Sequence, residues 1–179
     1  MSDKFKLLLK QIHFPQHEEA YNEIKSGSIE SVKLFKSKRQ WFFVFSFRNL
    51  LSYETFTLFD NLLHSSFDSL GAKVSYMINV EDISCDQSLL EAYFSYALDI
   101  LKSSHFSIYS LFSNLGIEIS NNSISVKAPA HILRENLHER FIALIADVLS
   151  NVGLSNVSIS VLEDKEASSS LEEAYETNK

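Results

Sequence analysis

Residues 40–47 read QWFFVFSF, and this stretch decides how the first half of the chain folds. Aromatic residues and valine favour extended backbone, so the stretch predicts a β-strand. Alternate side chains of a strand point to opposite faces. One face would carry the aromatic residues Trp41, Phe43, Phe45 and Phe47. The opposite face would carry Phe42 and Val44, so we expect this strand to need apolar cover on both sides.

Two further strands are predicted around this one. Apolar residues at Ile29, Val32 and Leu34 among polar neighbours predict a strand over residues 29–36. The turn at 37–39 then joins it to residues 40–47 as a β-hairpin. Strict alternation over residues 73–80 predicts the third strand, with Val74, Tyr76, Ile78 and Val80 on one face.

Helical spacing of apolar residues predicts three helices in the same half. Two are short, over residues 4–13 and 17–25, and the third runs over residues 53–70 with Leu70 on its apolar side. Ser52 is suited to cap the long helix at its N-terminus, and Gly71 is suited to end it.

The second half of the chain repeats this order. Helices are predicted over 86–101, 107–115 and 131–152, and strands around 117–119, 124–126 and 157–161. We therefore expect an α+β fold of two consecutive αββαβ units, residues 1–83 and 84–164. This order resembles a KH module of the second topological type, although the Gly-x-x-Gly loop that clamps nucleic acid is absent.

Composition narrows the class of protein. The 179 residues are 45% hydrophobic and 22% charged, as in globular domains. Neither a membrane-spanning run nor a secretory signal is visible, so we expect a cytoplasmic protein without membrane contact. The net charge of −7 argues against a dedicated nucleic-acid binder. Residues 165–179 are predicted to be an acidic flexible linker, as though a further domain followed.

No reactive centre is indicated by the motifs. The four glycines are too dispersed for a phosphate-binding loop, and no Gly-x-Ser-x-Gly occurs. His131 and His138 could share a helix face, but no metal-binding motif includes them. Cys85 precedes a helix whose dipole is expected to lower the thiol pKa, and no partner is apparent. We therefore predict no catalytic residue, metal site, cofactor or small-molecule substrate.

The first unit has apolar side chains that need cover beyond its expected core. Four apolar side chains need cover outside the expected core: Phe35, Phe42, Val44 and Met77. The cover would come from the chain's own helices, over 4–13 or 86–101, or from a partner protein.

The only basic cluster lies at the turn of the first hairpin, where Lys36, Lys38 and Arg39 are close in sequence. These cations could contact an acidic partner or a phosphate. The alternative is an ordinary solvated hairpin tip.

Several segments resemble the N-terminal region of the PolC-type α subunit of DNA polymerase III of low-GC Gram-positive bacteria. They are FKLLLKQIHFP at residues 5–15, WFFVF at 41–45 and LLEAYF at 89–94. The resemblance covers residues 1–164. It implies a non-catalytic region preceding the domains that perform DNA-directed DNA synthesis and 3′–5′ proofreading.

The resemblance also implies partners. The family's N-terminal module is similar to the KH-like domain of the clamp-loader τ subunit that binds the polymerase. We therefore expect a protein-interaction module that docks to replisome proteins, with τ suspected and weak or no direct nucleic-acid binding. The alternative is a nucleic-acid-binding module that guides template through the basic hairpin.

Overall fold

A computed structural model describes residues 3–166 of the chain, which form two compact α+β units. The first unit runs to Ser84 and includes Ser150–Leu154. The second comprises Cys85–Leu149 and continues from Ser155.

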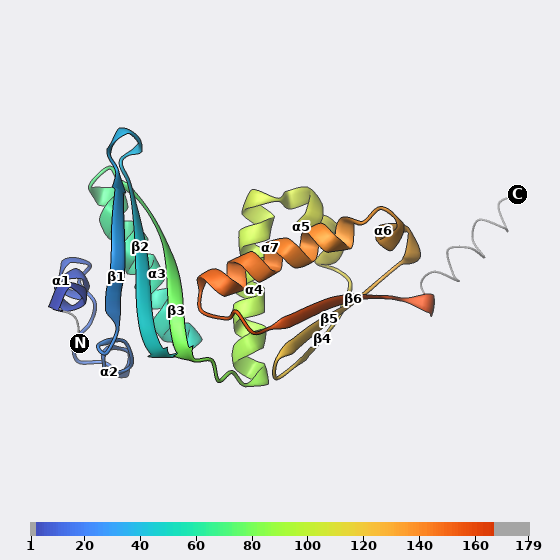
Figure 1. The fold of residues 1–179 in the computed structure, drawn as a ribbon, viewed down its shortest axis with the longest axis horizontal. Coiled ribbons are helices and arrows are strands. Elements are labelled where there is room, and N and C mark those ends of the chain that lie inside the picture. Colours follow the sequence, from blue (N-terminus) through green and yellow to red (C-terminus); the bar gives the residue numbers. More distant parts are fainter. Residues whose placement is uncertain (1–2, 167–179) are drawn as a thin grey trace, which may run out of the picture. The chain divides into compact units, whose positions relative to one another are not determined.

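The first unit contains three helices, one 3-10 turn and three strands (Figure 1). They are α1 Asp3–Gln11, α2 Glu19–Ile24, β1 Ser28–Phe35, η1 Lys36–Lys38, β2 Gln40–Asn49, α3 Tyr53–Ser69 and β3 Lys73–Asp82. The sheet order is β1-β2-β3. Strand β2 pairs antiparallel with β1 and parallel with β3.

The second unit contains α4 Gln87–Ser104, α5 Phe106–Phe112, β4 Gly116–Ser120, β5 Ser123–Ala128, α6 Ala130–Arg134, α7 Leu137–Asn151 and β6 Ser158–Glu163. Its sheet has the order β4-β5-β6 with the same antiparallel and parallel pairings. The predicted α+β fold with two αββαβ units is therefore confirmed.

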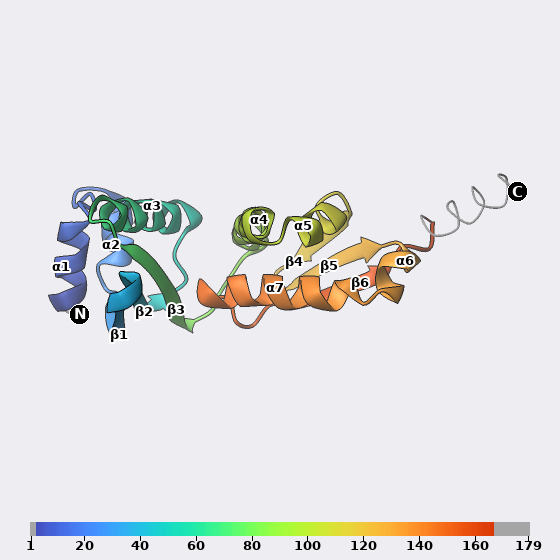
Figure 2. The ribbon, with the colours of Figure 1, turned by 90° about the horizontal axis from the view of Figure 1, so that it is seen from above.

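Aromatic side chains fill the core of the first unit. The Phe5 ring of α1 lies 5.8 Å from Phe45 and 5.7 Å from Phe47, and Phe59 of α3 lies 5.2 Å from Phe45. Both helices therefore pack on the face of β2 that carries the odd-numbered aromatic residues. Figure 2 shows α3 running along one side of this sheet.

The second unit also buries one face of its sheet. Ile124 and Val126 of β5 are fully buried, and the Phe112 and Phe141 rings of α5 and α7 stack at 4.3 Å. The alternate residues Ser123 and Ser125 are polar, so this sheet needs helices on one face only.

The predicted helix over 131–152 is wrong in one respect, because it is broken into α6 and α7. Asn136 lies between them with a φ of 57°, in the left-handed region that asparagine tolerates better than most residues. His131 and His138 consequently lie on different helices and share no face.

Three apolar residues of the predicted elements are exposed in the structure. A register shift between Ile29 and Ser31 brings Val32 and Leu34 onto the helix-covered face, opposite Phe43 and Trp41. Both side chains are nevertheless exposed, because β1 is an edge strand. Leu70 is 75% exposed, since α3 has already ended and Leu70 forms its C-cap.

Two further expectations concern the ends of elements and of the chain. Ser52 caps α3 as predicted, by accepting a hydrogen bond from the Thr55 backbone, and Gly71 follows the helix with a φ of 68°. The predicted acidic linker lies outside the described residues from position 167 onward.

None of the described helices combines the length and apolar character needed to span a bilayer.

Candidate protein-interaction surface

Four predicted contact residues lie on one face of the first sheet. Val44 pairs with Met77 of β3, and Phe42 pairs with Ser75. Direct partners in adjacent strands share a face, and alternate residues of one strand return to it. Phe35 pairs with Gln40, two residues before Phe42, so it reaches the same face. We call Phe42, Val44 and Met77 the apolar strip.

Within the described part of the first unit, no helix covers this face. Helices α1 and α3 contact the opposite face through Phe5 and Phe59. The alternative in which the helix over 4–13 covers the strip is therefore wrong. The three strip residues are partly exposed, and Phe35 is 48% exposed.

Polar side chains frame the strip at both ends. Gln40 Nε2 donates a hydrogen bond to Ser75 Oγ at 3.3 Å near the hairpin turn. Asn79 Nδ2 donates to Glu30 Oε2 at 3.0 Å toward the opposite end. An apolar centre with a polar border is the arrangement found at protein interfaces.

The second unit shows that the fold does not require apolar residues on this face. In that unit the corresponding face of β5 carries Ser123, Ser125 and Lys127, and β6 contributes Ser158, Ser160 and the exposed Leu162, so the face is mostly polar. The two sheets have the same strand order and pairings. The apolar strip is therefore a property of the first unit and not of the αββαβ topology.

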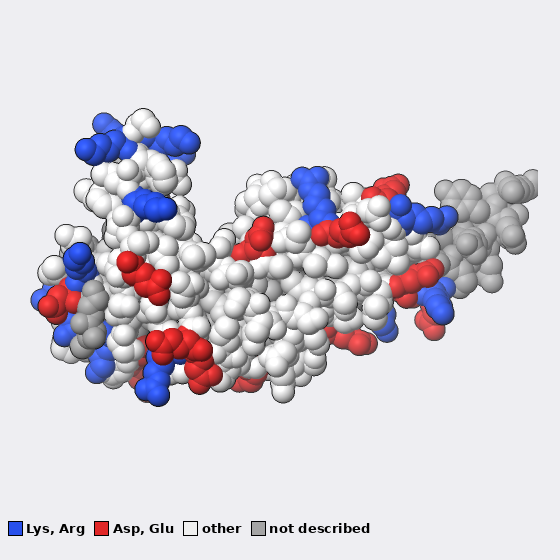
Figure 3. Space-filling model, viewed as in Figure 1, with Lys and Arg blue, Asp and Glu red and all other residues white. Residues whose placement is uncertain are grey.

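The hairpin turn carries the predicted basic cluster (Figure 3). Arg39 has a φ of 48°, and its backbone N–H donates to the Lys36 carbonyl at 3.3 Å. The Lys73 N–H donates to the Arg39 carbonyl at 2.9 Å, which anchors the turn to β3. We call Lys36, Lys38, Arg39 and Lys73 the basic tip.

Sequence reasoning missed Lys73. The sequence could have indicated it. Gly71 ends α3, so β3 starts close to Lys73, and the parallel pairing then sets Lys73 beside Gln40. No carboxylate among residues 3–166 forms an ion pair with the basic tip. The cations are thus free to meet negative charge from outside the described chain.

Charge is divided unequally between the units. Residues 1–84 carry ten Lys and Arg against ten Asp and Glu, whereas residues 85–166 carry five against ten. The first unit is therefore neutral overall, and its tip is locally positive. The second unit is acidic.

A titratable cluster that sequence analysis did not single out links α3 to β3. Asp60 Oδ1 accepts a hydrogen bond from the Tyr76 hydroxyl at 2.5 Å and lies 3.2 Å from His64 Nδ1. The hydrogen bond to Asp60 raises the pKa of His64 to about 9, although partial burial opposes the shift. The cluster is half-exposed on α3 and holds the imidazolium as a structural cation.

The other candidate residues do not assemble into a reactive site. Burial raises the pKa of the Cys85 thiol, and the charge of Asp86 raises it further, so the expectation that the helix dipole would lower it is wrong. Among residues 3–166, no group of three or more His, Cys, Asp or Glu side chains is placed to hold a metal ion.

Two family models match most of the chain. The model described as "DNA polymerase III polC-type N-terminus I" matches residues 4–78, and "DNA polymerase III polC-type N-terminus II" matches residues 92–179. The two matches correspond closely in extent to the two structural units, and each falls mainly within one of them.

Curated relatives carry the same description. The protein named DNA polymerase III PolC-type of Streptococcus agalactiae serotype III is 26% identical over the whole chain. The proteins of that name from Streptococcus suis and Streptococcus mutans are 27% and 23% identical over 90% and 100% of the chain. The chain spans only 11–12% of the length of these relatives. No solved structure matches it.

Proposed function

The chain belongs to the N-terminal region of PolC-type DNA polymerase III, and from this premise we propose that it is a non-catalytic protein-interaction module of a replicative polymerase. The chemistry of DNA synthesis and proofreading would then belong to other parts of the polymerase. The module itself would act in the cytoplasm, where it would hold the polymerase to other replisome proteins.

The observation that carries this proposal is the apolar strip. Phe42, Val44 and Met77 lie on a sheet face without a helix from their own unit, whereas the equivalent face of the second unit is mostly polar. Burying apolar surface contributes about 25 cal/mol per Å². A partner that covered the strip would gain this contribution, and the polar border would fix its orientation.

The basic tip indicates the charge of the partner. Lys36, Lys38, Arg39 and Lys73 lie at the end of the strip nearest the hairpin turn. A partner with an apolar patch beside acidic side chains would complement both surfaces, and its association rate would fall as salt is added. Our candidate is the clamp-loader τ subunit, which the family resemblance suggests.

The proposal is tested by measuring the affinity of the 179-residue chain for purified τ subunit immobilised on a sensor surface. Val44→Asp should abolish binding, because it buries a carboxylate at the centre of the interface. Leu7→Asp is the matched control, since Leu7 is 59% exposed on α1 and lies away from the strip. Equal loss for both variants, or no binding of the unmodified chain to τ or to any other replisome protein, would contradict the proposal.

A nucleic-acid function is the alternative that the basic tip favours. Four cations without a described acidic partner could contact the phosphates of a template strand. Titration of single-stranded DNA at increasing salt separates the two functions. Tight binding that falls steeply with salt and is lost in Lys36→Gln/Lys38→Gln, but kept in Lys6→Gln/Lys10→Gln, would favour template guidance.

A further inference from the structure

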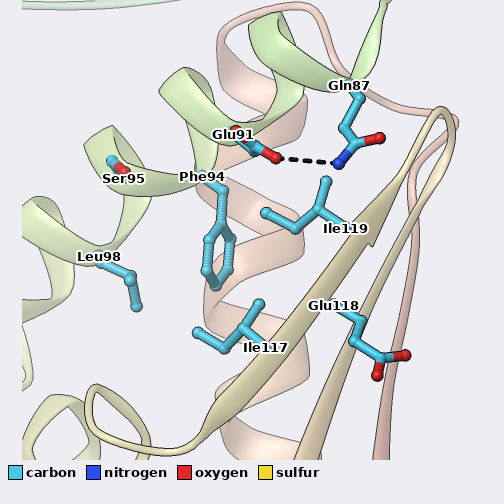
Figure 4. A pocket seen from close by; sticks show the side chains of 8 residues that line it. All are labelled: Gln87, Glu91, Phe94, Ser95, Leu98, Ile117, Glu118 and Ile119. Carbon is cyan, nitrogen blue, oxygen red and sulfur yellow. Dashed lines mark hydrogen bonds between the residues drawn. The ribbon is translucent and has the colours of Figure 1, made fainter.

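The second unit has a groove between α4 and β4 that the proposed function does not use. It has a volume of about 570 Å³. Helix α4 supplies one wall with Gln87, Glu91, Phe94, Ser95 and Leu98, and β4 supplies the other with Ile117, Glu118 and Ile119. Figure 4 shows Phe94 and Leu98 directed toward the two isoleucines, so the interior of the groove is apolar.

Strand β4 is an open edge of its sheet. The order is β4-β5-β6, and no strand among residues 3–166 pairs with the other side of β4. An unpaired edge presents backbone N–H and C=O groups that can hydrogen-bond to an added strand. The groove lies along this same strand, so an added strand could place its side chains in the groove.

The geometry of β4 supports that placement. Ile117 and Ile119 point toward α4, whereas Glu118 between them points away and forms an ion pair with Lys127 at 3.6 Å. Ile117 and Ile119 pair with Val126 and Ile124, so they extend the buried apolar face of the sheet to its edge. A further strand would continue this face, and every second side chain would lie beneath α4.

The acidic charge of the second unit indicates which kind of segment the groove would bind. Glu91 lies at one end of the groove, where Gln87 Nε2 donates to its Oε1 at 3.1 Å, whereas Lys127 already offsets the charge of Glu118 at the edge. Residues 85–166 have twice as many acidic as basic residues. An acidic occupant would be repelled, and one with lysine or arginine between apolar residues would be attracted.

We propose that β4 and the α4–β4 groove bind an extended basic segment of a partner protein, which adds to the sheet as a further strand. Alternate apolar side chains fill the groove beside Phe94 and Leu98, and the basic side chains face solvent and the acidic surface. This mode of recognition combines backbone hydrogen bonds for affinity with side-chain pockets for specificity. The proposal concerns the second unit and is independent of the apolar strip.

The test uses the isotopically labelled 179-residue chain and a seven-residue peptide in which lysine alternates with valine and leucine. We expect amide signals of Ile117, Glu118 and Ile119 to shift on titration, and hydrogen exchange of the β4 amides to slow. Two control peptides are a scrambled one that groups the lysines together and one that carries glutamate in place of lysine. Neither control should produce these changes.

A matched pair of variants completes the test. Leu98→Lys places a charge in the groove and should weaken peptide binding on the order of tenfold or more, because a buried leucine contact is lost. Leu162→Lys makes the same change on β6, where Leu162 is 53% exposed, and should leave binding unchanged. Equal binding of the scrambled peptide, signal changes confined to residues outside β4 and α4, no binding, or self-association of the chain through β4 would each overturn the proposal.

Discussion

Val44 and Met77 are direct partners in the parallel pairing of β2 and β3, on the face of the first sheet that α1 and α3 leave open. The next residue along β2, Phe45, points to the other face and is fully buried. Neighbouring residues of one strand thus have different roles. Phe45 contributes to the core, whereas Val44 is available for contact with another molecule.

This difference predicts that substitutions at these two adjacent positions change the free energy of unfolding by very different amounts. Phe45→Ala should lower the free energy of unfolding of the first unit by about 3–5 kcal/mol, because it leaves a cavity among four aromatic rings. Val44→Ser, which copies the serine found on the same face of β5, should change it by less than about 1 kcal/mol. Urea unfolding followed by fluorescence measures both, since Trp41 is the single tryptophan and lies in this unit. A large loss for Val44→Ser would mean that the strip serves stability.

A second prediction concerns the carboxylate of Glu23, which connects α2 to the start of α3. Its Oε2 accepts hydrogen bonds from Ser52 Oγ at 2.9 Å and from Thr55 Oγ1 at 2.6 Å, and its Oε1 accepts from the Ser52 backbone. Glu23→Ala should destabilise the first unit by about 1–2 kcal/mol, because charged hydrogen bonds at a helix N-terminus are lost. Glu19→Ala, an exposed change on the same helix, is the control in the same urea experiment. Similar results for both would show that the Glu23 contacts contribute nothing.

A third prediction is a pH dependence from His64. Its pKa is raised from 6.5 to about 9 by Asp60 in the folded protein, so the folded state binds a proton more tightly than the unfolded chain. The stabilisation is fully present below pH 6.5 and is lost as the pH rises toward 9. We expect the urea midpoint of the first unit to fall across this window.

Substitution of Asp60 tests whether its hydrogen bond causes the raised pKa of His64. Asp60→Asn should move the midpoint of the His64 imidazole titration, followed by NMR, down toward 6.5 and should flatten the pH dependence. An unshifted titration in this variant would show that the hydrogen bond to Asp60 is not the cause. Because the His64 side chain is 46% exposed, we expect its contribution to stability to be small.

Most of the fold followed from local patterns in the sequence. The strands with strict alternation, such as residues 73–80, and the long helix capped at Ser52 form as predicted, because period and capping are local properties. The break at Asn136 was missed, since the apolar spacing continues across it and only the backbone conformation changes. The exposure of Leu34 leaves no local pattern, because it depends on the position of β1 at the edge of the sheet.

The candidate surface was predictable only in part. Alternation along β2 assigns Phe42 and Val44 to one face, and the third strand supplies Met77. Lys73 and the groove beside β4 depend on tertiary pairing, and pairing between distant segments leaves no local pattern. The His64–Asp60–Tyr76 cluster was missed for the same reason, since Tyr76 lies on another element.

The last prediction compares two glycines whose surroundings differ. A Cβ at Gly27 would overlap the Phe47 ring and approach Phe5, both of which are core residues that cannot move aside freely. Gly27→Ala should therefore destabilise the first unit by about 1–3 kcal/mol, as overpacked cores do. A Cβ at Gly116 would meet nothing within 4 Å, so Gly116→Ala should be nearly neutral or slightly stabilising. Urea unfolding monitored by Trp41 for the first variant and by far-UV circular dichroism for the second gives both values. If Gly27→Ala were as mild as Gly116→Ala, the close packing of Phe5 and Phe47 around the start of β1 would be incorrect.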